Sequence, residues 1–229
     1  DVCSSDLGIA KKQTLRLLDG FCYMDGRRGY QVKKELIDSI HLDQSPTKDH
    51  FTCVQGLMNL CDNGEKDGGL VLVPDSHKFI TEFFENRDPA ELKSDFYQFT
   101  DEDKLHPIFK NTIKVCGKAG DFMMWDSRTF HCNTLPSTQN ARACVYICQI
   151  PKEKVGDRAK IMRREAWEAK RCCTHHPGEG MKMFPALPKG ADENMLKIIS
   201  KISGEDKDLT PLQRSLLCIK EKAEQEKKP

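Results

Sequence analysis

The sequence has no long hydrophobic run and no excess of charge of either sign. Its longest apolar stretches, Gly69–Pro74 and Ala143–Ile150, have the length of β-strands, whereas a membrane-spanning helix needs about 20 apolar residues. The 36 basic and 35 acidic residues give a net charge of +1, so charge provides no reason to expect nucleic acid or an anionic membrane as a partner. We therefore expect a protein with no membrane span and no nucleic-acid partner.

The sequence also lacks any C-x-x-C pair, although it contains 11 cysteines. An odd count, irregular spacing and the absence of a signal-peptide pattern argue against a disulfide framework. We predict reduced thiols and a cytoplasmic location, with several cysteines acting as small hydrophobic residues inside strands. The chain starts at Asp1 without an initiating methionine, and we expect an N-terminally truncated protein.

What the sequence does contain is a series of short apolar segments separated by turn signals. With 229 residues, a single β barrel or sandwich can occupy most of the chain. Short strands with such turn signals between them are typical of a sandwich or jelly roll. The predicted strands are Leu15–Met24 (with a bulge or turn at Asp19-Gly20), Phe51–Cys61, Gly69–Val73, Thr112–Cys116, Phe122–Trp125, Thr129–Asn133 and Arg142–Ile150. The segment Gln31–Ser39 could form either a helix or a strand.

Helices are predicted in one insertion and after Pro151. The acidic, aromatic segment Phe79–Leu105 is interpreted as a helix followed by irregular chain, which could be a lid over a barrel mouth or a mere connection. The later helices are predicted at Asp157–Arg171, Asn194–Ile202 and Thr210–Lys222. We predict one domain overall, in which a β core of residues 11–152 carries a C-terminal helical extension of residues 153–229 that packs on it.

The triplet His41-Leu42-Asp43 could supply two metal ligands. Side chains two residues apart point to the same side of an extended chain, so the imidazole and the carboxylate can converge on one ion. His131, which follows the predicted strand Phe122–Trp125 and a tight turn, is the best third candidate. Two histidines and a carboxylate leave coordination positions open, as in non-haem iron oxygenases, whereas zinc prefers a tetrahedral site.

Each of these signals is weak by itself. H-x-D triplets arise by chance, and a single histidine such as His131 is more often structural or on the surface. Arg142 begins a predicted strand next to that of His131, so it could enter the same cavity, where a planar guanidinium would need an anionic partner. It could equally face solvent or pair with an acidic side chain, and its position alone does not decide between these alternatives.

The order of several motifs resembles that of the phytanoyl-CoA dioxygenase-like family, in a branch from fungi and other microbial eukaryotes. The motifs are HLDQSP (41–46), CVQG (53–56), DGGLVLVPDSHK (67–78), GD (120–121), WDSRTFH (125–131) and Arg142. The match is ordered and extends over roughly residues 19–177, which is far more specific than any one motif. One departure is Asp75, where the family usually has glycine; aspartate tolerates left-handed backbone, so the turn can survive.

The resemblance implies a mainly β double-stranded β-helix (a cupin-like jelly roll) with Fe(II) held by His41, Asp43 and His131. It also implies 2-oxoglutarate and O2 as cosubstrates, with the far carboxylate of 2-oxoglutarate bound by Arg142. Arg128 is a rival for that role, but it precedes His131 in the same turn and is expected to brace the loop.

The pocket itself is predicted from the alternation of side chains along the strands. Gln55, Asn59, Asn133 and Tyr146 are expected to contact the cosubstrate or to support the metal ligands. For Asn59, an outward polar face is an open alternative. Asp126 is expected to help Arg128 to brace the loop.

The implied reaction is that of an oxidoreductase, a dioxygenase that hydroxylates a C–H bond of a small molecule and converts 2-oxoglutarate to succinate and CO2. One alternative is a ligand-binding barrel of the same fold that has lost turnover, which the short segment before His41 favours. Another is a zinc-binding interaction module at residues 172–176, although Cys-Cys-Thr-His-His does not match the usual zinc spacings. The sequence identifies neither the substrate nor the oligomeric state.

Overall fold

The computed structural model describes residues 14–29, 37–48, 50–169, 171, 173–174, 176–178, 180–183, 210–211 and 214. Its strands are β1 Thr14–Met24, β2 His41–Leu42, β3 Val54–Asn59, β4 Gly69–Leu72, β5 Tyr97–Gln98, β6 Ile113–Lys114, β7 Phe122–Asp126, β8 His131–Thr134 and β9 Arg142–Pro151. Its α-helices are α1 Ile80–Phe84 and α2 Asp157–Glu168. Short 3-10 helices lie at Gly26–Arg28, Ser76–Lys78, Asp103–Leu105, Pro107–Asn111 and Lys152–Lys154.

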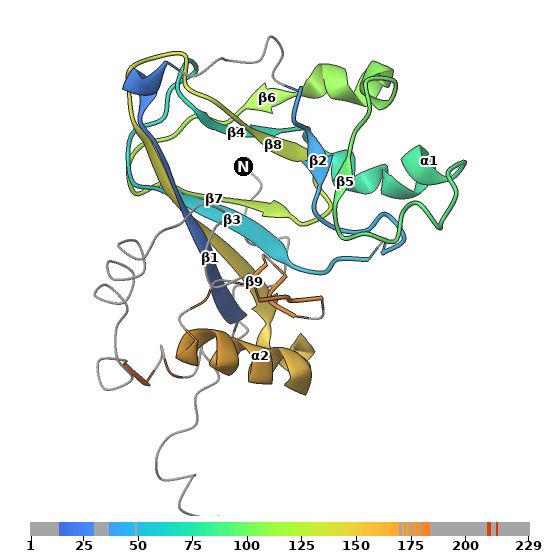
Figure 1. The fold of residues 1–229 in the computed structure, drawn as a ribbon. Coiled ribbons are helices and arrows are strands. Elements are labelled where there is room, and N and C mark those ends of the chain that lie inside the picture. The colour runs from blue at the N-terminus through green and yellow to red at the C-terminus, as the bar shows by residue number, and fades with distance from the viewer. Residues whose placement is uncertain are drawn as a thin grey trace, which may run out of the picture. The chain divides into compact units, whose positions relative to one another are not determined.

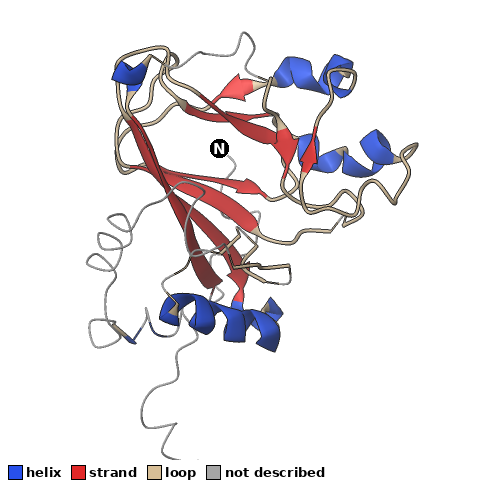
Figure 2. Ribbon diagram, viewed as in Figure 1, coloured by secondary structure: helices blue, strands red, loops and turns tan. Residues whose placement is uncertain are grey.

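The strands form two sheets, one of four strands in the order β1-β9-β3-β7 and one of five strands in the order β5-β2-β8-β4-β6. The pairs β3–β7, β2–β8 and β4–β8 are antiparallel. In the compact unit Gly20–Ile147, the strands of the two sheets face each other as two layers (Figure 1). Strands dominate this unit (Figure 2), so the predicted class, a mainly β jelly roll, is confirmed.

Strand β4 explains why the sequence Gly69–Val73 is continuously apolar. Successive side chains of a strand point to opposite faces of the sheet. Leu70 joins an apolar cluster with Leu57, Trp125 and Cys144, whereas Val71 and Val73 join a second cluster with residues of the insertion. Both faces of the strand are therefore buried.

The insertion Phe79–Leu105 forms the predicted helix, α1, but it also supplies a strand that the sequence did not indicate. Strand β5 pairs with β2, and Gln98 lies opposite His41. Phe99, which is 1% exposed, packs against Phe83, Phe109 and Phe130. The insertion is thus anchored beside β2 by an aromatic core, while its role as a lid stays a prediction.

A second compact unit consists of residues 1–19 and 148–229. Within it, α2 confirms the predicted helix, which ends at Glu168 rather than at Arg171. Arg163 of α2 is buried and donates from Nη2 to the carbonyl oxygen of Pro177 (3.2 Å). No helix in the described ranges combines the length and the apolar character needed to cross a bilayer.

Several sequence predictions have other outcomes. β1 is one continuous strand through Asp19-Gly20, so the alternative of a turn at this position is wrong. Asp75 does adopt left-handed backbone, with φ of 63°, as expected for the residue that replaces glycine. The predicted segments at 31–36 and 194–202 and most of 210–222 lie outside the described residues, and the division into residues 11–152 and 153–229 stays a prediction.

Candidate metal centre

His41 and His131 face each other across two neighbouring strands. They are direct partners in the antiparallel pair β2–β8, and directly opposed side chains lie on the same face of a sheet. Their ring centroids are 4.6 Å apart. His131 is 3% exposed, whereas His41 is half-buried. The two histidines are 90 residues apart in the sequence, and the pairing of β2 with β8 brings them together.

Asp43 completes the group from the segment that follows β2. Its Oδ2 lies 3.1 Å from His131 Nε2, and its Oδ1 lies 3.6 Å from His41 Nε2. One ligand atom of each residue lies within 4.8 Å of the other two, and no other such group of three is found in the part of the chain that the structure describes. Two ligands about 2.1 Å from one ion and at right angles to each other are about 3 Å apart. The arrangement is thus close to that of an occupied site.

Backbone carbonyl groups orient both imidazole rings. The Nδ1–H of His41 donates to the carbonyl oxygen of Ser39, and that of His131 donates to the carbonyl oxygen of Thr129, each at 2.8 Å. A proton held on Nδ1 leaves the Nε2 lone pair of a neutral ring for a metal ion. Burial alone would lower the pKa of His131, but the charge and hydrogen bond of Asp43 outweigh it and raise the pKa.

A chain of hydrogen bonds fixes the carboxylate of Asp43. Gln55 Nε2 donates to Asp43 Oδ2 (2.9 Å), and Trp125 Nε1 donates to Gln55 Oε1 (2.9 Å). Gln55, expected to line the pocket, thus supports a candidate ligand. Trp125 was not predicted to take part; its place on the inner face of β7 could have been read from alternation, but its hydrogen bond could not.

The loops that carry the candidate ligands are also tied together. Ser127 Oγ donates to Gln44 Oε1 (2.7 Å), which joins the segment after Asp43 to the turn between β7 and β8. In that turn, Arg128 binds Asp126 through Nε (2.9 Å) and Nη2 (2.8 Å). The bracing role predicted for Arg128 and Asp126 agrees with this geometry. Gln44 was missed, because a glutamine beside a ligand carries no pattern that would reveal it.

Arg142 lies inside the protein and not in bulk water. It is 4% exposed, and its Nη2 donates to Asn133 Oδ1 (2.6 Å) and, more distantly, to Tyr146 Oη (3.4 Å). Its Nη1 is buried without a hydrogen-bond partner. An unsatisfied buried donor is costly, so this guanidinium fits an anionic ligand such as a carboxylate. Desolvation is also the main reason why the pKa of Tyr146 is raised.

Asn59 is buried as well. It is 4% exposed, and its Nδ2 has no hydrogen-bond partner. The alternative of an outward polar face is therefore wrong, and Asn59 offers a second buried donor. All the predicted site residues thus lie in the unit Gly20–Ile147; the structure brings together His41, Asp43, His131 and Gln55 in one group and Arg142, Asn133 and Tyr146 in another.

The insertion contributes one aromatic side chain that the sequence did not single out. The Phe96 ring lies 5.3 Å from that of His41, centroid to centroid, and is 50% exposed. Trp125 lies 5.3 Å from the ring of His131 but is buried. The accessible side of the metal centre is therefore the side of His41 and Phe96.

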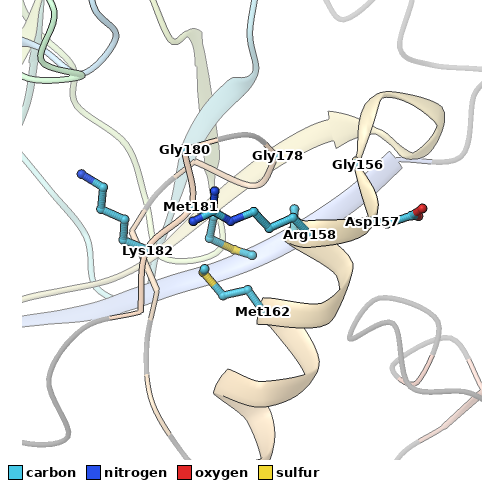
Figure 3. A pocket seen from close by; sticks show the side chains of 9 residues that line it. Gly156, Asp157, Arg158, Met162, Gly178, Gly180, Met181 and Lys182 are labelled. Atoms are coloured by element: carbon cyan, nitrogen blue, oxygen red, sulfur yellow. The ribbon is translucent and has the colours of Figure 1, made fainter.

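A cavity of about 510 Å³ lies in the second compact unit, residues 1–19 and 148–229 (Figure 3). It is lined by the start of α2 and by the segment around Gly178, with Arg158 and Lys182 beside Met162 and Met181. None of the predicted site residues lines it. Cys172 and His175 lie outside the described residues, so the hypothesis of a zinc module is not tested.

Comparison with known proteins finds similarity to phytanoyl-CoA dioxygenase. The family model for phytanoyl-CoA dioxygenase matches residues 37–144. The chain is 30% identical over 145 residues to Ava biosynthesis cluster protein O of Aspergillus versicolor, with 59% of this chain and 45% of the relative covered. It is 27% identical over 113 residues to a Dictyostelium discoideum protein named for phytanoyl-CoA dioxygenase, with 49% and 31% covered. The chain thus spans less than half the length of these relatives.

Solved structures that match part of this chain include that of EctD from S. alaskensis with bound Fe. It is 16% identical, with 58% of this chain and 44% of that chain covered and a TM-score of 0.39. The epimerase SnoN in complex with Fe3+, alpha ketoglutarate and nogalamycin RO is 17% identical, with 64% and 71% covered and a TM-score of 0.36.

Proposed function

We propose that this chain, whose residues 37–144 match the family model for phytanoyl-CoA dioxygenase, is an Fe(II)- and 2-oxoglutarate-dependent dioxygenase. In this proposal, the enzyme hydroxylates a C–H bond of a small molecule and releases succinate and CO2. The observation that carries the proposal is the convergence of His41, Asp43 and His131 in a unit that also contains a buried arginine with an unpartnered donor.

Within the proposed enzyme, His41, Asp43 and His131 hold Fe(II). Their two imidazoles and one carboxylate bring a single negative charge to a divalent ion, which leaves it positively charged and open to anionic ligands. Bound iron supplies the redox chemistry that couples O2 to the oxidation of 2-oxoglutarate and of the substrate. The protein's part is to fix the ligands before the metal arrives, through Ser39, Thr129 and the Gln55–Trp125 pair.

Arg142 is proposed to bind the far carboxylate of 2-oxoglutarate. Asn133 holds one arm of the guanidinium by the 2.6 Å hydrogen bond from Nη2, which leaves Nη1 for the ligand. Asn59 Nδ2 is a further donor for the same molecule. The apolar side chains of Leu57, Leu70 and Trp125 exclude water, and hydrogen bonds to charged groups gain strength in such surroundings.

The substrate is proposed to be a small molecule that approaches from the side of His41 and Phe96, where the metal centre is accessible. The insertion Phe79–Leu105 would cover it. The alternative of an inert ligand-binding barrel is less well supported, because all three candidate ligands are present and converge. The family resemblance does not imply a CoA ester.

The test is an anaerobic titration of the chain with Fe(II) and 2-oxoglutarate, followed by admission of O2. We expect a weak visible charge-transfer band that depends on both ligands, and then succinate release, measured against a panel of metabolites. His131→Ala removes one metal ligand and should abolish both signals. An inert barrel would bind 2-oxoglutarate but make no succinate, which would contradict the proposal.

Replacing Arg142 by lysine tests its proposed role separately. Lysine keeps the charge but loses the planar fork that pairs with a carboxylate, so we expect 2-oxoglutarate affinity to fall about tenfold or more, roughly 1.4 kcal/mol. Isothermal titration of the Fe(II)-loaded chain under anaerobic conditions measures it. Arg27→Lys is the matched control, because the Arg27 side chain is 73% exposed and pairs with Asp25. Equal affinities of the two variants would exclude Arg142 as the anchor.

A further inference from the structure

Two cysteine thiols meet beside Arg142, and the proposed reaction uses neither of them. Cys22 lies on β1 and Cys144 on β9, which are neighbours in the four-stranded sheet. Cys144 is 0% exposed and belongs to the apolar cluster of Leu57 and Trp125, against which Cys22 packs. Their side chains are hydrogen-bonded to each other, and both are thiols rather than halves of a disulfide.

The surroundings make the two thiols chemically unequal. A hydrogen bond from Cys144 lowers the pKa of Cys22 to about 6; burial opposes this effect, while the charge of Arg142 and a hydrogen bond from Tyr146 reinforce it. The same contact with Cys22, together with burial, raises the pKa of Cys144. A thiolate stabilised by a cation is the reactive form of cysteine. Of the two, Cys22 is therefore the better nucleophile, and Cys144 holds its proton more strongly.

The two cysteines also differ in solvent exposure, and the one with the lower pKa is the more exposed. Cys22 is partly exposed, so a small oxidant can reach it, while Cys144 is fully buried. A cysteine that acts only as a small hydrophobic residue would need neither the guanidinium nor the tyrosine hydroxyl beside it. The cluster has the composition of a redox-active dithiol, with a low-pKa accessible cysteine next to a resolving one.

We propose that Cys22 and Cys144 form a reversible disulfide when the protein meets a hydroperoxide. The Cys22 thiolate attacks one peroxide oxygen, the O–O bond breaks, and the released hydroxide takes a proton and leaves as water. The sulfur of Cys144 then attacks the Cys22 sulfenic acid, the S–O bond breaks, and the departing hydroxide takes the proton of Cys144 as a second water. Two thiols and one hydrogen peroxide thus give one disulfide and two waters.

The sheet geometry permits this bond. Cys22 and Cys144 lie on neighbouring strands and their side chains are in contact. Facing side chains on such strands have Cβ atoms about 4.5–5.5 Å apart, close to the roughly 3.5–4.5 Å that a disulfide needs. Cys144 is two residues after Arg142 on β9, and alternation puts both on one face. Oxidation therefore removes a negative charge from the immediate neighbourhood of the guanidinium.

The experiment uses the purified full chain with a metal chelator, so that no iron decomposes the oxidant. The protein is treated with one equivalent of hydrogen peroxide and analysed by thiol titration and by peptide mapping without reduction. We expect the loss of two thiols per chain and a cross-linked peptide that joins Cys22 to Cys144, both reversed by dithiothreitol. Because neither readout depends on turnover, the result is independent of the proposed dioxygenase activity.

Variants locate the reaction. Cys22→Ser and Cys144→Ser should each abolish the cross-linked peptide, while Cys116→Ser, at an exposed cysteine, should keep it. The wild-type peptide map is conclusive even if a variant folds poorly. Oxidation of Cys22 to sulfinic or sulfonic acid without a cross-link, a disulfide between other cysteines, or the persistence of all thiols would overturn the proposal.

Discussion

At the scale of single residues, the candidate metal centre is held by hydrogen bonds that its side chains make away from the metal position. His41 and His131 donate to carbonyl groups two residues earlier in the chain, Ser39 and Thr129. Asp43 receives its hydrogen bond from Gln55 across the two sheets. The contacts to Ser39 and Thr129 join residues close together in the chain, whereas the contact to Gln55 depends on how the sheets pack.

Gln55→Leu should weaken metal binding, because the carboxylate of Asp43 then loses the donor that orients it. Changes to such supporting hydrogen bonds typically cost 10–100-fold in metal affinity, and we expect a loss of about that size for Fe(II) in anaerobic calorimetry. Trp125→Phe removes only the donor to Gln55 and should have a smaller effect. Equal affinities of Gln55→Leu and the wild type would show that Asp43 needs no support.

At the scale of elements, the turn after β4 depends on one residue with left-handed backbone. Asp75 has φ of 63° and is followed in the turn by Ser76. The Oγ of Ser76 accepts a hydrogen bond (2.8 Å) from the amide of Phe130, the residue before His131. The turn thus connects the backbone of β4 to the strand that carries a candidate ligand.

Asp75→Val should destabilise the protein by about 1–2 kcal/mol, because a β-branched side chain disfavours positive φ. Asp75→Asn is the matched control: it tolerates the same backbone and loses only the exposed ion pair with Lys78, which is worth little. Urea denaturation of both variants measures the difference. If valine and asparagine had the same effect, backbone strain would not be the cause.

The insertion has its own buried carboxylate. Asp103 is 3% exposed and accepts hydrogen bonds from Tyr97 Oη (2.9 Å) and from the amide of Thr100 (2.8 Å), and it also binds Arg87. Burial opposes ionisation, but these hydrogen bonds and the charge of Arg87 lower the pKa of Asp103 below its ordinary value of 3.8. The ionised carboxylate therefore stabilises the folded state.

Asp103→Asn should cost about 1–3 kcal/mol at pH 7, because an amide cannot accept all of these hydrogen bonds. A pKa that is lowered in the folded state gives stability that is present above the unfolded pKa and lost as pH falls through the folded one. The difference in the free energy of unfolding between the variant and the wild type, measured with denaturant, should thus be largest at neutral pH and become smaller below about pH 4. Asp101→Asn, at a fully exposed carboxylate, is the control. If the loss of stability in Asp103→Asn did not change with pH, this explanation would be wrong.

At the scale of the whole molecule, ligands that bind only the folded state should stabilise it by mass action. A divalent metal at 100 times its dissociation constant adds about 2.7 kcal/mol, which corresponds to roughly 5–10 °C in Tm for a chain of this size. Mn²⁺, which suits the same ligand types, should give this shift in differential scanning fluorimetry, and 2-oxoglutarate should increase it. His131→Ala should lose the shift. An equal shift in that variant would place the metal elsewhere.

The sequence by itself determined the periodicity of the strands, the pairing of His41 with Asp43 as candidate ligands and the tolerance of Asp75 for left-handed backbone. These features depend on residues close together in the chain, so local sterics and alternation suffice to predict them. Only the tertiary structure decided that His41 lies opposite His131, that Trp125 acts through Gln55, that Phe96 comes from the insertion, and that Cys22 meets Cys144 beside Arg142. Strand order and register join residues far apart in sequence, and only the packing of the two sheets fixes them.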